Sequence, residues 1–188
     1  LHLPVVDDLE LKGMVSENDL LSVHDPAVTQ VAHLIVGKSD YITENQHPYD
    51  AIATFSTGEL SAIPLLDSTN HYIGTITLSS LTAYLAEMFS ITQPGGIIIL
   101  EIDEKDYLLT EIAQIVESND AKILSLYVRS QVESRLLEVT LKLNKINIDP
   151  VLQTFERYGY TVKASFSENA DQDYLKDRFN SFLKYLNV

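Results

Sequence analysis

The first half of the chain repeats one pattern of apolar and polar positions. The stretch Leu3–Ser16 begins with an apolar Leu-Pro-Val-Val run, passes through an acidic turn and continues through a glycine to a serine. The same order returns in Ile63–Thr77, where Pro64 takes the place of Pro4 and the glycine comes one position later relative to the proline. Each copy predicts two short strands joined by a turn, followed by a helix that begins at the Ser or Thr. The pattern therefore indicates a tandem of two similar units.

Only the second copy is preceded by further elements. An extended stretch at 39–43 and a helix near 47–55 come before its first strand, and a helix at 27–36 is expected to connect the copies. A helix after the second copy is predicted by apolar residues at i, i+3, i+4 and i+7, which are Leu81, Tyr84, Leu85 and Met88. The first copy starts directly at its strand. We interpret its module as incomplete at the N-terminus and the chain as a shortened form of a longer protein.

The pattern changes after Gln93–Gly96, where proline and glycine interrupt the periodicity and predict a domain boundary. The elements expected beyond it are strands at 97–100, 123–128, 137–143 and 160–166, with helices at 108–119 and 149–158. Asp149 is the expected N-cap of the second helix, and Pro150 suits its first turn. This βαββαβ order predicts a ferredoxin-like domain in a chain of the α+β class.

The end of the chain predicts one more helix, at 168–188. Its apolar residues fall on one face and are Leu175, Phe179, Phe182 and Leu186. Because the opposite face carries both acids and bases, we expect this helix to pack on its own domain or on a dimer mate and not on a membrane.

The repeated Pro-to-Gly block resembles the CBS domain, whose modules pair and commonly hold an adenosine nucleotide between them. The βαββαβ region that follows is similar to the ACT domain, and the combination resembles the CBS–ACT proteins of the acetoin-utilisation regulatory family. The resemblance implies the following division: a CBS pair at 1–92, with a partial first module at 1–26 and the linking helix and second module at 27–92, an ACT-like domain at 95–167 and a C-terminal helix at 168–188.

The resemblance also implies a ligand site. In the first copy Ser16 would contact ribose or phosphate, and Asp19 would accept hydrogen bonds from the ribose hydroxyls. The alternative is a capping box at the start of a helix, and both roles are compatible at a helix N-terminus. In the second copy Thr77 is retained but Ser80 replaces the acid, so we expect weaker ribose recognition there. The expected contacts to adenine are Tyr41, Ile42, Ala62, Ile63 and Pro64.

Composition excludes several classes of function. The chain has 13 basic and 27 acidic residues, for a net charge of −14, which disfavours binding to nucleic acids and to anionic membranes. It has no cysteine, its five histidines are dispersed, and no apolar run approaches the length of a membrane span. No phosphate-binding loop, nucleophile elbow or metalloprotease motif is present. We therefore expect a cytoplasmic protein that is not an enzyme and has no metal site.

The turn before the first helix of the ACT-like region is Asp103–Leu108, which lacks the glycine that amino-acid-binding ACT domains usually offer. Its three carboxylates predict a poor cradle for an amino acid, and Asp106 is expected to cap the helix. Two hypotheses follow. In the first, the chain is a regulator that requires no cofactor, senses AMP, ADP, ATP or S-adenosylmethionine through its CBS pair, and dimerises or relays the signal through its ACT-like domain. In the second, it is a purely structural module for self-association or for binding of another protein.

Overall fold

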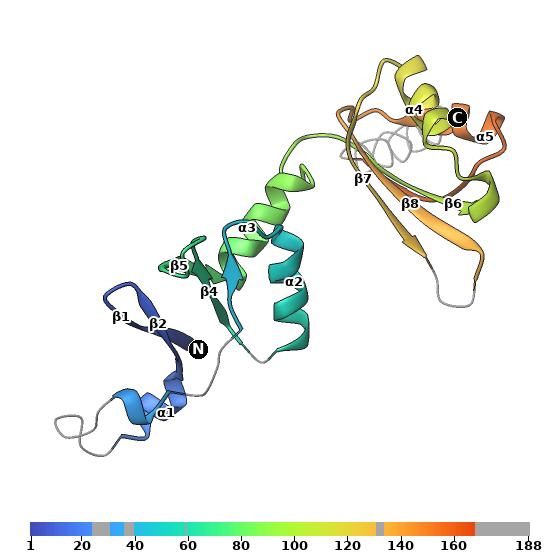
Figure 1. The fold of residues 1–188 in the computed structure, drawn as a ribbon. Coiled ribbons are helices and arrows are strands. Elements are labelled where there is room, and N and C mark those ends of the chain that lie inside the picture. Colours follow the sequence, from blue (N-terminus) through green and yellow to red (C-terminus); the bar gives the residue numbers. More distant parts are fainter. Residues whose placement is uncertain (24–30, 36–39, 59, 131–133, 168–188) are drawn as a thin grey trace, which may run out of the picture. The chain divides into compact units, whose positions relative to one another are not determined.

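The computed structural model describes residues 1–23, 31–35, 40–58, 60–130 and 134–167 (Figure 1). The predicted C-terminal helix lies outside the described residues, as does part of the predicted connecting helix, of which the 3-10 turn η1 (Val31–His33) is described. The chain divides into two compact units, Leu1–Leu85 and Ala86–Val188, each of mixed helices and strands. The α+β class is confirmed.

The first unit contains both copies of the repeat. Its repeated elements are β1 (His2–Asp7), β2 (Glu10–Ser16) and α1 (Glu17–Leu21) in the first copy, and β4 (Ala62–Leu66), β5 (Tyr72–Thr77) and α3 (Leu78–Met88) in the second. Both hairpins are antiparallel, and Pro4 pairs with Met14 as Pro64 pairs with Thr75. The strand register also shifts at the equivalent place in both hairpins, between Val5 and Val6 in the first and between Leu65 and Leu66 in the second. The predicted repeat is confirmed, and the two copies also share this bulge, which the sequence did not predict.

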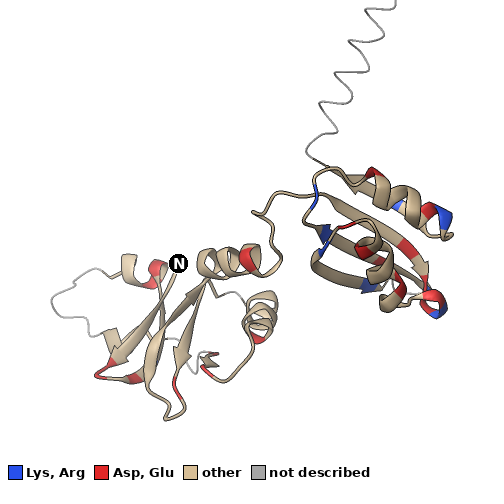
Figure 2. Cartoon of the chain, turned by 90° about the horizontal axis from the view of Figure 1, so that it is seen from above, with Lys and Arg blue, Asp and Glu red and all other residues tan. Residues whose placement is uncertain are grey.

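Hydrogen bonds join the two hairpins of the first unit at two places, and Figure 2 shows the strands of this unit side by side. At one end the backbone N–H of His2 donates to Ser61 Oγ at 2.7 Å, and the N–H of Ser61 donates to His2 Nδ1 at 3.2 Å. At the other end the N–H of Tyr72 donates to the carbonyl of Leu9 at 2.7 Å. These hydrogen bonds join segments some sixty residues apart, so the two copies form one folded unit.

The second copy has two further elements, β3 (Ile42–Thr43) and α2 (Pro48–Thr57). Strand β3 pairs in parallel with β4. Helix α2 begins at a capping box. His47 Nδ1 accepts a hydrogen bond from the N–H of Tyr49, and Asp50 Oδ2 accepts one from the N–H of His47. Helices α2 and α3 cover the sheet and enclose a small core, whose buried members are Ile42, Ala51, Ile63 and Leu81.

The second unit has the predicted βαββαβ order. Its elements are β6 (Ile97–Asp103), η2 (Glu104–Asp106), α4 (Leu109–Ser118), β7 (Ile123–Ser130), β8 (Leu136–Leu143), α5 (Asp149–Arg157) and β9 (Thr161–Phe166). The sheet has the antiparallel order β7-β8-β6-β9. Alternate residues of β6 and β8, such as Ile98 and Leu141, are buried against Ile112 of α4 and Phe155 of α5. The ferredoxin-like fold is confirmed.

Both predicted caps of the second unit were wrong. Asp149 is the first residue of α5 and not its N-cap, which is Ile148, a buried residue whose side chain makes no capping hydrogen bond. Asp106 does not cap α4, whose N-cap is Leu108 and has no side-chain hydrogen bond. The turn η2 comes between the strand and the helix and takes up Asp106.

Residues 86–92 group with the second unit, although the sequence places the boundary a few residues later. The ring of Phe89 meets that of Tyr127 edge-on at 5.8 Å between centroids, and the carbonyl of Phe89 accepts from Ser125 Oγ at 2.9 Å. In both units, none of the described helices combines the length and hydrophobicity that crossing a bilayer requires.

Gly95 lies so close to the backbone of Leu143 that a side chain at this position would clash, which leads to a stability prediction. Its φ is +148°, and an added Cβ would overlap the carbonyl oxygen of Leu143. We expect Gly95→Ala to destabilise the second unit by about 2–4 kcal/mol. Gly159 also has a positive φ, but a Cβ there would meet nothing within 4 Å, so Gly159→Ala should cost only about 1 kcal/mol. Hydrogen exchange of the β8 amides measures both, and equal effects would contradict the prediction.

Candidate functional site

The predicted pair of the first copy forms a helix cap. Ser16 Oγ accepts from the N–H of Asp19 at 3.1 Å and donates to Asp19 Oδ2 at 2.6 Å. Both side chains are partly buried, and the helix that they start, α1, has only five residues. The structure therefore has the capping interaction, with the carboxylate of Asp19 already engaged by its own serine. The ribose contact stays a prediction.

The equivalent pair of the second copy repeats this cap. Thr77 Oγ1 accepts from the N–H of Ser80 at 3.1 Å, and Ser80 Oγ accepts from the N–H of Thr77 at 2.9 Å. Both residues are exposed. The helix that follows, α3, has eleven residues, so its N-terminal amides present a more developed partial positive charge than those of α1.

The residues predicted to contact adenine do not gather in one cavity. Ala62, Ile63 and Pro64 lie in β4 and are buried. Ile42 is also buried but lines a pocket next to α2 and α3, whereas Tyr41 is half-exposed and lines a different hollow. The structure thus brings Ile42 and Ser80 together and leaves Tyr41 apart from them.

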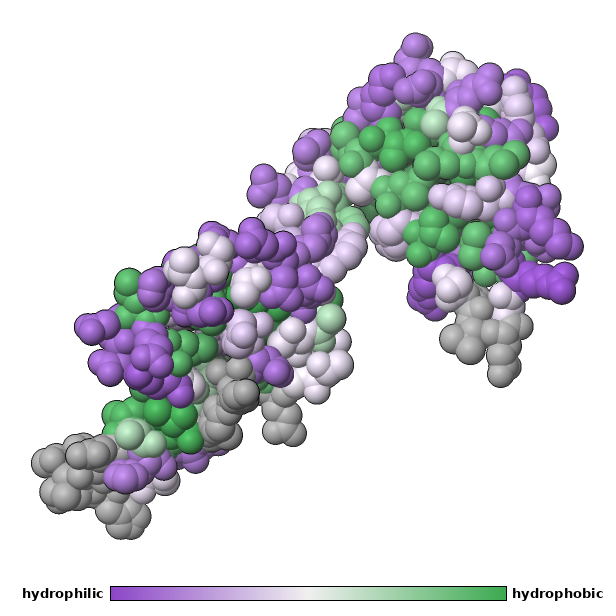
Figure 3. Space-filling view, viewed as in Figure 1, coloured by the Kyte–Doolittle hydropathy of each residue, from purple (hydrophilic) through white to green (hydrophobic). Residues whose placement is uncertain are grey.

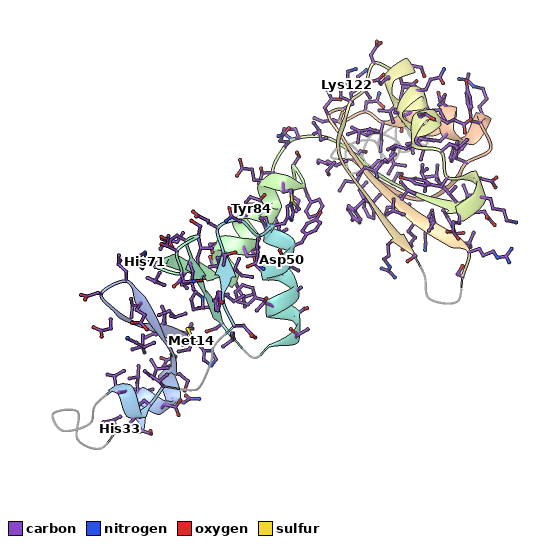
Figure 4. The ribbon with its side chains drawn as sticks, viewed as in Figure 1. Met14, His33, Asp50, His71, Tyr84 and Lys122 are labelled. Carbon is purple, nitrogen blue, oxygen red and sulfur yellow. The ribbon has the colours of Figure 1, made fainter. Side chains whose placement is uncertain are left out.

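The pocket that holds Ile42 and Ser80 is called here the second-copy pocket and has a volume of about 360 Å³. It is lined by Ile42, Thr43, Glu44, Gln46, Pro48, Ala51, Leu65, Ile76, Ser80, Leu81 and Tyr84. Figure 4 marks Tyr84 on α3 and Asp50 on α2, the two helices that border it. Most of the walls are apolar, and the one acid, Glu44, is held by a hydrogen bond from the N–H of Ser68 at 3.0 Å. Such a pocket suits a flat, largely apolar ring with a polar edge.

Sequence reasoning missed several of these lining residues. Leu65 lies in β4 and Ile76 in β5, the two strands of the second hairpin. Tyr84 was interpreted as part of the apolar stripe that closes the module. The signal that could have found Tyr84 is its polar hydroxyl on that stripe, because a tyrosine half-exposed between apolar residues suits a pocket rim.

The larger hollow, called here the first-copy hollow, measures about 970 Å³. It is lined by Val5, Asp7, Glu10, Leu11, Lys12, Gly13, Ala32, Ile35, Tyr41, Leu66 and Asn70. Its one described cation, Lys12, is paired with Glu10 at 2.6 Å, and this hydrogen bond raises the pKa of the Lys12 ammonium. With Asp7 and Glu10 both on its walls, the hollow is poorly matched to a phosphate.

A polar cavity of about 390 Å³ lies at the β6–α4 turn of the second unit. Its lining includes four acidic residues, which are Glu101, Asp103, Asp106 and Glu111. Tyr160 Oη donates to Glu111 Oε2 at 2.7 Å, and burial, together with this bond, raises the pKa of the Tyr160 phenol. The concentration of negative charge agrees with the expectation of a poor cradle for an amino-acid carboxylate. No group of histidines and carboxylates among the described residues could hold a metal ion.

One stretch of the chain, which contains the second copy, matches a known protein family. The family model described as CBS domain matches residues 31–87, which confirms the CBS resemblance for the second copy. Among curated proteins, homoserine O-acetyltransferase of Methanosarcina acetivorans is 28% identical over 83 residues, which cover 44% of this chain. The chain spans only 15% of the length of that relative.

Solved structures similar to this chain include a CBS domain pair/ACT domain protein from Thermotoga maritima, with 21% identity, a TM-score of 0.41 and coverage of 46% of this chain and 70% of that chain. Another is the CBS-pair protein CBSX2 of Arabidopsis thaliana in complex with AMP, with 22% identity, a TM-score of 0.41 and coverage of 46% and 71%. The resemblance to the acetoin-utilisation family stays a prediction.

The turn of the second hairpin, next to the first-copy hollow, gives a pH prediction. Asp67 Oδ1 accepts from the N–H of His71 and of Thr69 and from the Thr69 hydroxyl, each at 2.8 Å. These bonds, that from the His71 N–H first, hold the pKa of Asp67 below its ordinary value of 3.8. A depressed pKa means that the turn's contribution to stability is present above the ordinary pKa and is lost as the pH falls through the lower value.

An NMR titration of the Asp67 carboxyl carbon should therefore show a midpoint below 3.8. His71→Ala keeps the backbone N–H and should preserve most of the depression, whereas Thr69→Ala removes the hydroxyl donor and should raise the midpoint. A midpoint at or above the ordinary value in the parent chain would disprove this account of the turn.

Proposed function

We propose that the second-copy pocket binds an adenosine-containing metabolite such as AMP, ADP, ATP or S-adenosylmethionine, and that the chain is a regulator without catalytic activity. The observation that carries the proposal is that apolar walls and the N-terminal cap of α3 meet in one pocket of a region that matches the CBS domain. A purine needs the first feature, and a ribose or phosphate group is served by the second.

The arrangement of the pocket suggests how the ligand would lie. The base would contact Ile42, Leu65 and the ring of Tyr84, and the sugar would lie towards Ser80 at the start of α3. At about 360 Å³ the volume is near the lower end of the range for small-molecule sites, roughly 300–1,000 Å³. The pocket would therefore enclose the nucleoside and leave any phosphates towards solvent.

The first copy is the poorer candidate for this ligand. Asp19 is held by Ser16, α1 is a short helix, and the first-copy hollow has an acidic wall. We infer that one nucleoside binds per chain, in the second copy.

Regulation would follow from differential binding. If the ligand prefers one packing of α2 and α3 around the pocket, it shifts the population towards that packing by the ratio of its affinities for the two. The second unit, which we propose is an ACT-like domain, would then respond by dimerising or by relaying the change to another protein. We place this activity in the cytoplasm.

Calorimetry with a panel of AMP, ADP, ATP and S-adenosylmethionine tests the proposal. Tyr84→Ala removes an aromatic wall and should weaken binding about tenfold, which corresponds to about 1.4 kcal/mol. Tyr49→Ala is the matched control, because Tyr49 is also an exposed helical tyrosine of this module but does not line the pocket. Its affinity should equal that of the parent.

Two results would count against the proposal. Absence of binding by every member of the panel at millimolar concentration would favour the purely structural role in self-association. Equal weakening by Tyr84→Ala and Tyr49→Ala would mean that the ligand binds elsewhere.

A further inference from the structure

Two polar side chains of the second-copy pocket each keep one polar atom without a partner among the described residues. They belong to Glu44 and Gln46, which lie in the turn between β3 and α2 and line the pocket. Both residues are exposed and border the opening of the pocket, whereas Ile42 and Leu81 are buried within it. Much of the visible surface of the first unit is hydrophilic (Figure 3), and an apolar pocket with a polar rim is a site that a ring with a polar edge can enter.

Glu44 offers a hydrogen-bond acceptor at this rim. Its Oε1 accepts from the N–H of Ser68 at 3.0 Å, which holds the carboxylate in one orientation. Within the part of the chain that the structure describes, no group donates to the other oxygen, Oε2. A carboxylate oxygen accepts hydrogen bonds and does not donate them. Oε2 therefore suits a ligand atom that carries a hydrogen.

Gln46 offers a donor at the same rim. Its Oε1 accepts from the N–H of Thr43 at 2.8 Å and from the Thr43 hydroxyl at 3.1 Å. An N–H donor can bond only to the oxygen of a carboxamide, so this contact fixes which end of the side chain is which. The NH2 group of Gln46, Nε2, then donates to none of the described residues. It suits a ligand atom with a lone pair.

Glu44 lies at the opposite end of β4 from the start of α3. Ser80 Oγ accepts from the N–H of Thr77 at 2.9 Å, and Thr77 pairs with Ala62, the first residue of β4. The N–H of Glu44 instead donates to the carbonyl of Leu66, the last residue of β4, at 2.9 Å. The five residues of β4 span about 13 Å, a length that a nucleoside with a hydrogen bond at each end can bridge. A sugar at Ser80 thus places the far edge of its base near Glu44.

We propose that Glu44 and Gln46 bind the edge of the purine base and select adenine over guanine. The inference rests on the function proposed above, in which this pocket binds a nucleoside. Adenine presents a 6-amino donor beside the N7 acceptor, whereas guanine has the O6 acceptor in place of the amino group. Glu44 Oε2 accepts from the amino group, and Gln46 Nε2 donates to N7.

The same arrangement excludes guanine. Its O6 would face the Glu44 carboxylate, so that two acceptors would meet and each would lose a hydrogen bond to water. The negative charge of the carboxylate adds repulsion, and such an unfavourable contact with the wrong ligand is an effective source of specificity. The ligand class is therefore narrowed to purines with a free 6-amino group.

Calorimetry of the 188-residue chain with AMP and GMP tests the selection. AMP should bind roughly 10–100 times more tightly than GMP, which is the discrimination expected of a good two-point contact to a base edge. Purine riboside, which lacks the 6-amino group, should bind about tenfold more weakly than adenosine. This second comparison uses the parent chain alone and so remains decisive if a variant fails to fold.

Glu44→Gln should reverse the preference. The N–H of Ser68 still requires an oxygen, so the new carboxamide turns its NH2 group towards the base. A donor then faces the amino group of adenine, whereas O6 of guanine gains a partner. We expect the ratio of the AMP affinity to the GMP affinity to fall by about tenfold or more.

Glu87→Gln is the matched control. It removes the same charge from an exposed residue of α3 that does not line the pocket. The ratio of affinities in this variant should equal that of the parent. A change in net charge leaves the ratio unaffected, because AMP and GMP carry the same phosphate.

Three results would overturn the inference, each in a different way. Absence of binding by both nucleotides would refute the proposed function and this inference with it. Equal affinities of the parent for AMP and GMP would refute selection at the base edge but leave nucleotide binding in place. A ratio unchanged by Glu44→Gln would assign the selection to other groups and remove Glu44 from it.

Discussion

The hydrogen bonds between the two copies are the constraint on which the first unit depends. His2 and Ser61 exchange hydrogen bonds at the start of β1 and β4, and Tyr72 donates to Leu9 at the opposite end of the hairpins. A two-stranded hairpin alone is marginally stable in water. Joining the hairpins gives each a neighbour, and the second copy, with its own helices and core, supports the first.

The two copies share the features that their local sequence determines and differ in the burial that neighbouring elements determine. Proline, bulge and N-cap occur at equivalent places in both hairpins, because they depend on backbone geometry and on residues close in sequence. Burial does not repeat, because it depends on β3 and α2, which only the second copy has among the described residues. The candidate ligand pocket belongs to the second copy for the same reason: its walls come from these two elements as well as from α3.

Much of the fold could be predicted from the sequence, since the repeat and the alternating strands of the second unit have strong periodicity. The helix caps at Asp149 and Asp106 could not. Helix α5 has the buried Ile148 as its N-cap, and Asp106 lies in the 3-10 turn η2 that precedes α4. The candidate site was predicted only in part. Ile42 and Ser80 share a pocket, but a family pattern does not reveal how deeply Ile63 is buried or that Tyr84 forms a wall.

Native-state hydrogen exchange of the Ser61 and Tyr72 amides tests most directly whether the two copies fold as one unit. Each of these N–H groups donates to the other copy. We expect both to be protected at least a hundredfold and to lose protection together with amides of the β4–β5 hairpin. Exchange of these two amides at the rate of an unstructured chain, while the hairpin itself remains protected, would show that the copies fold separately and would contradict the account.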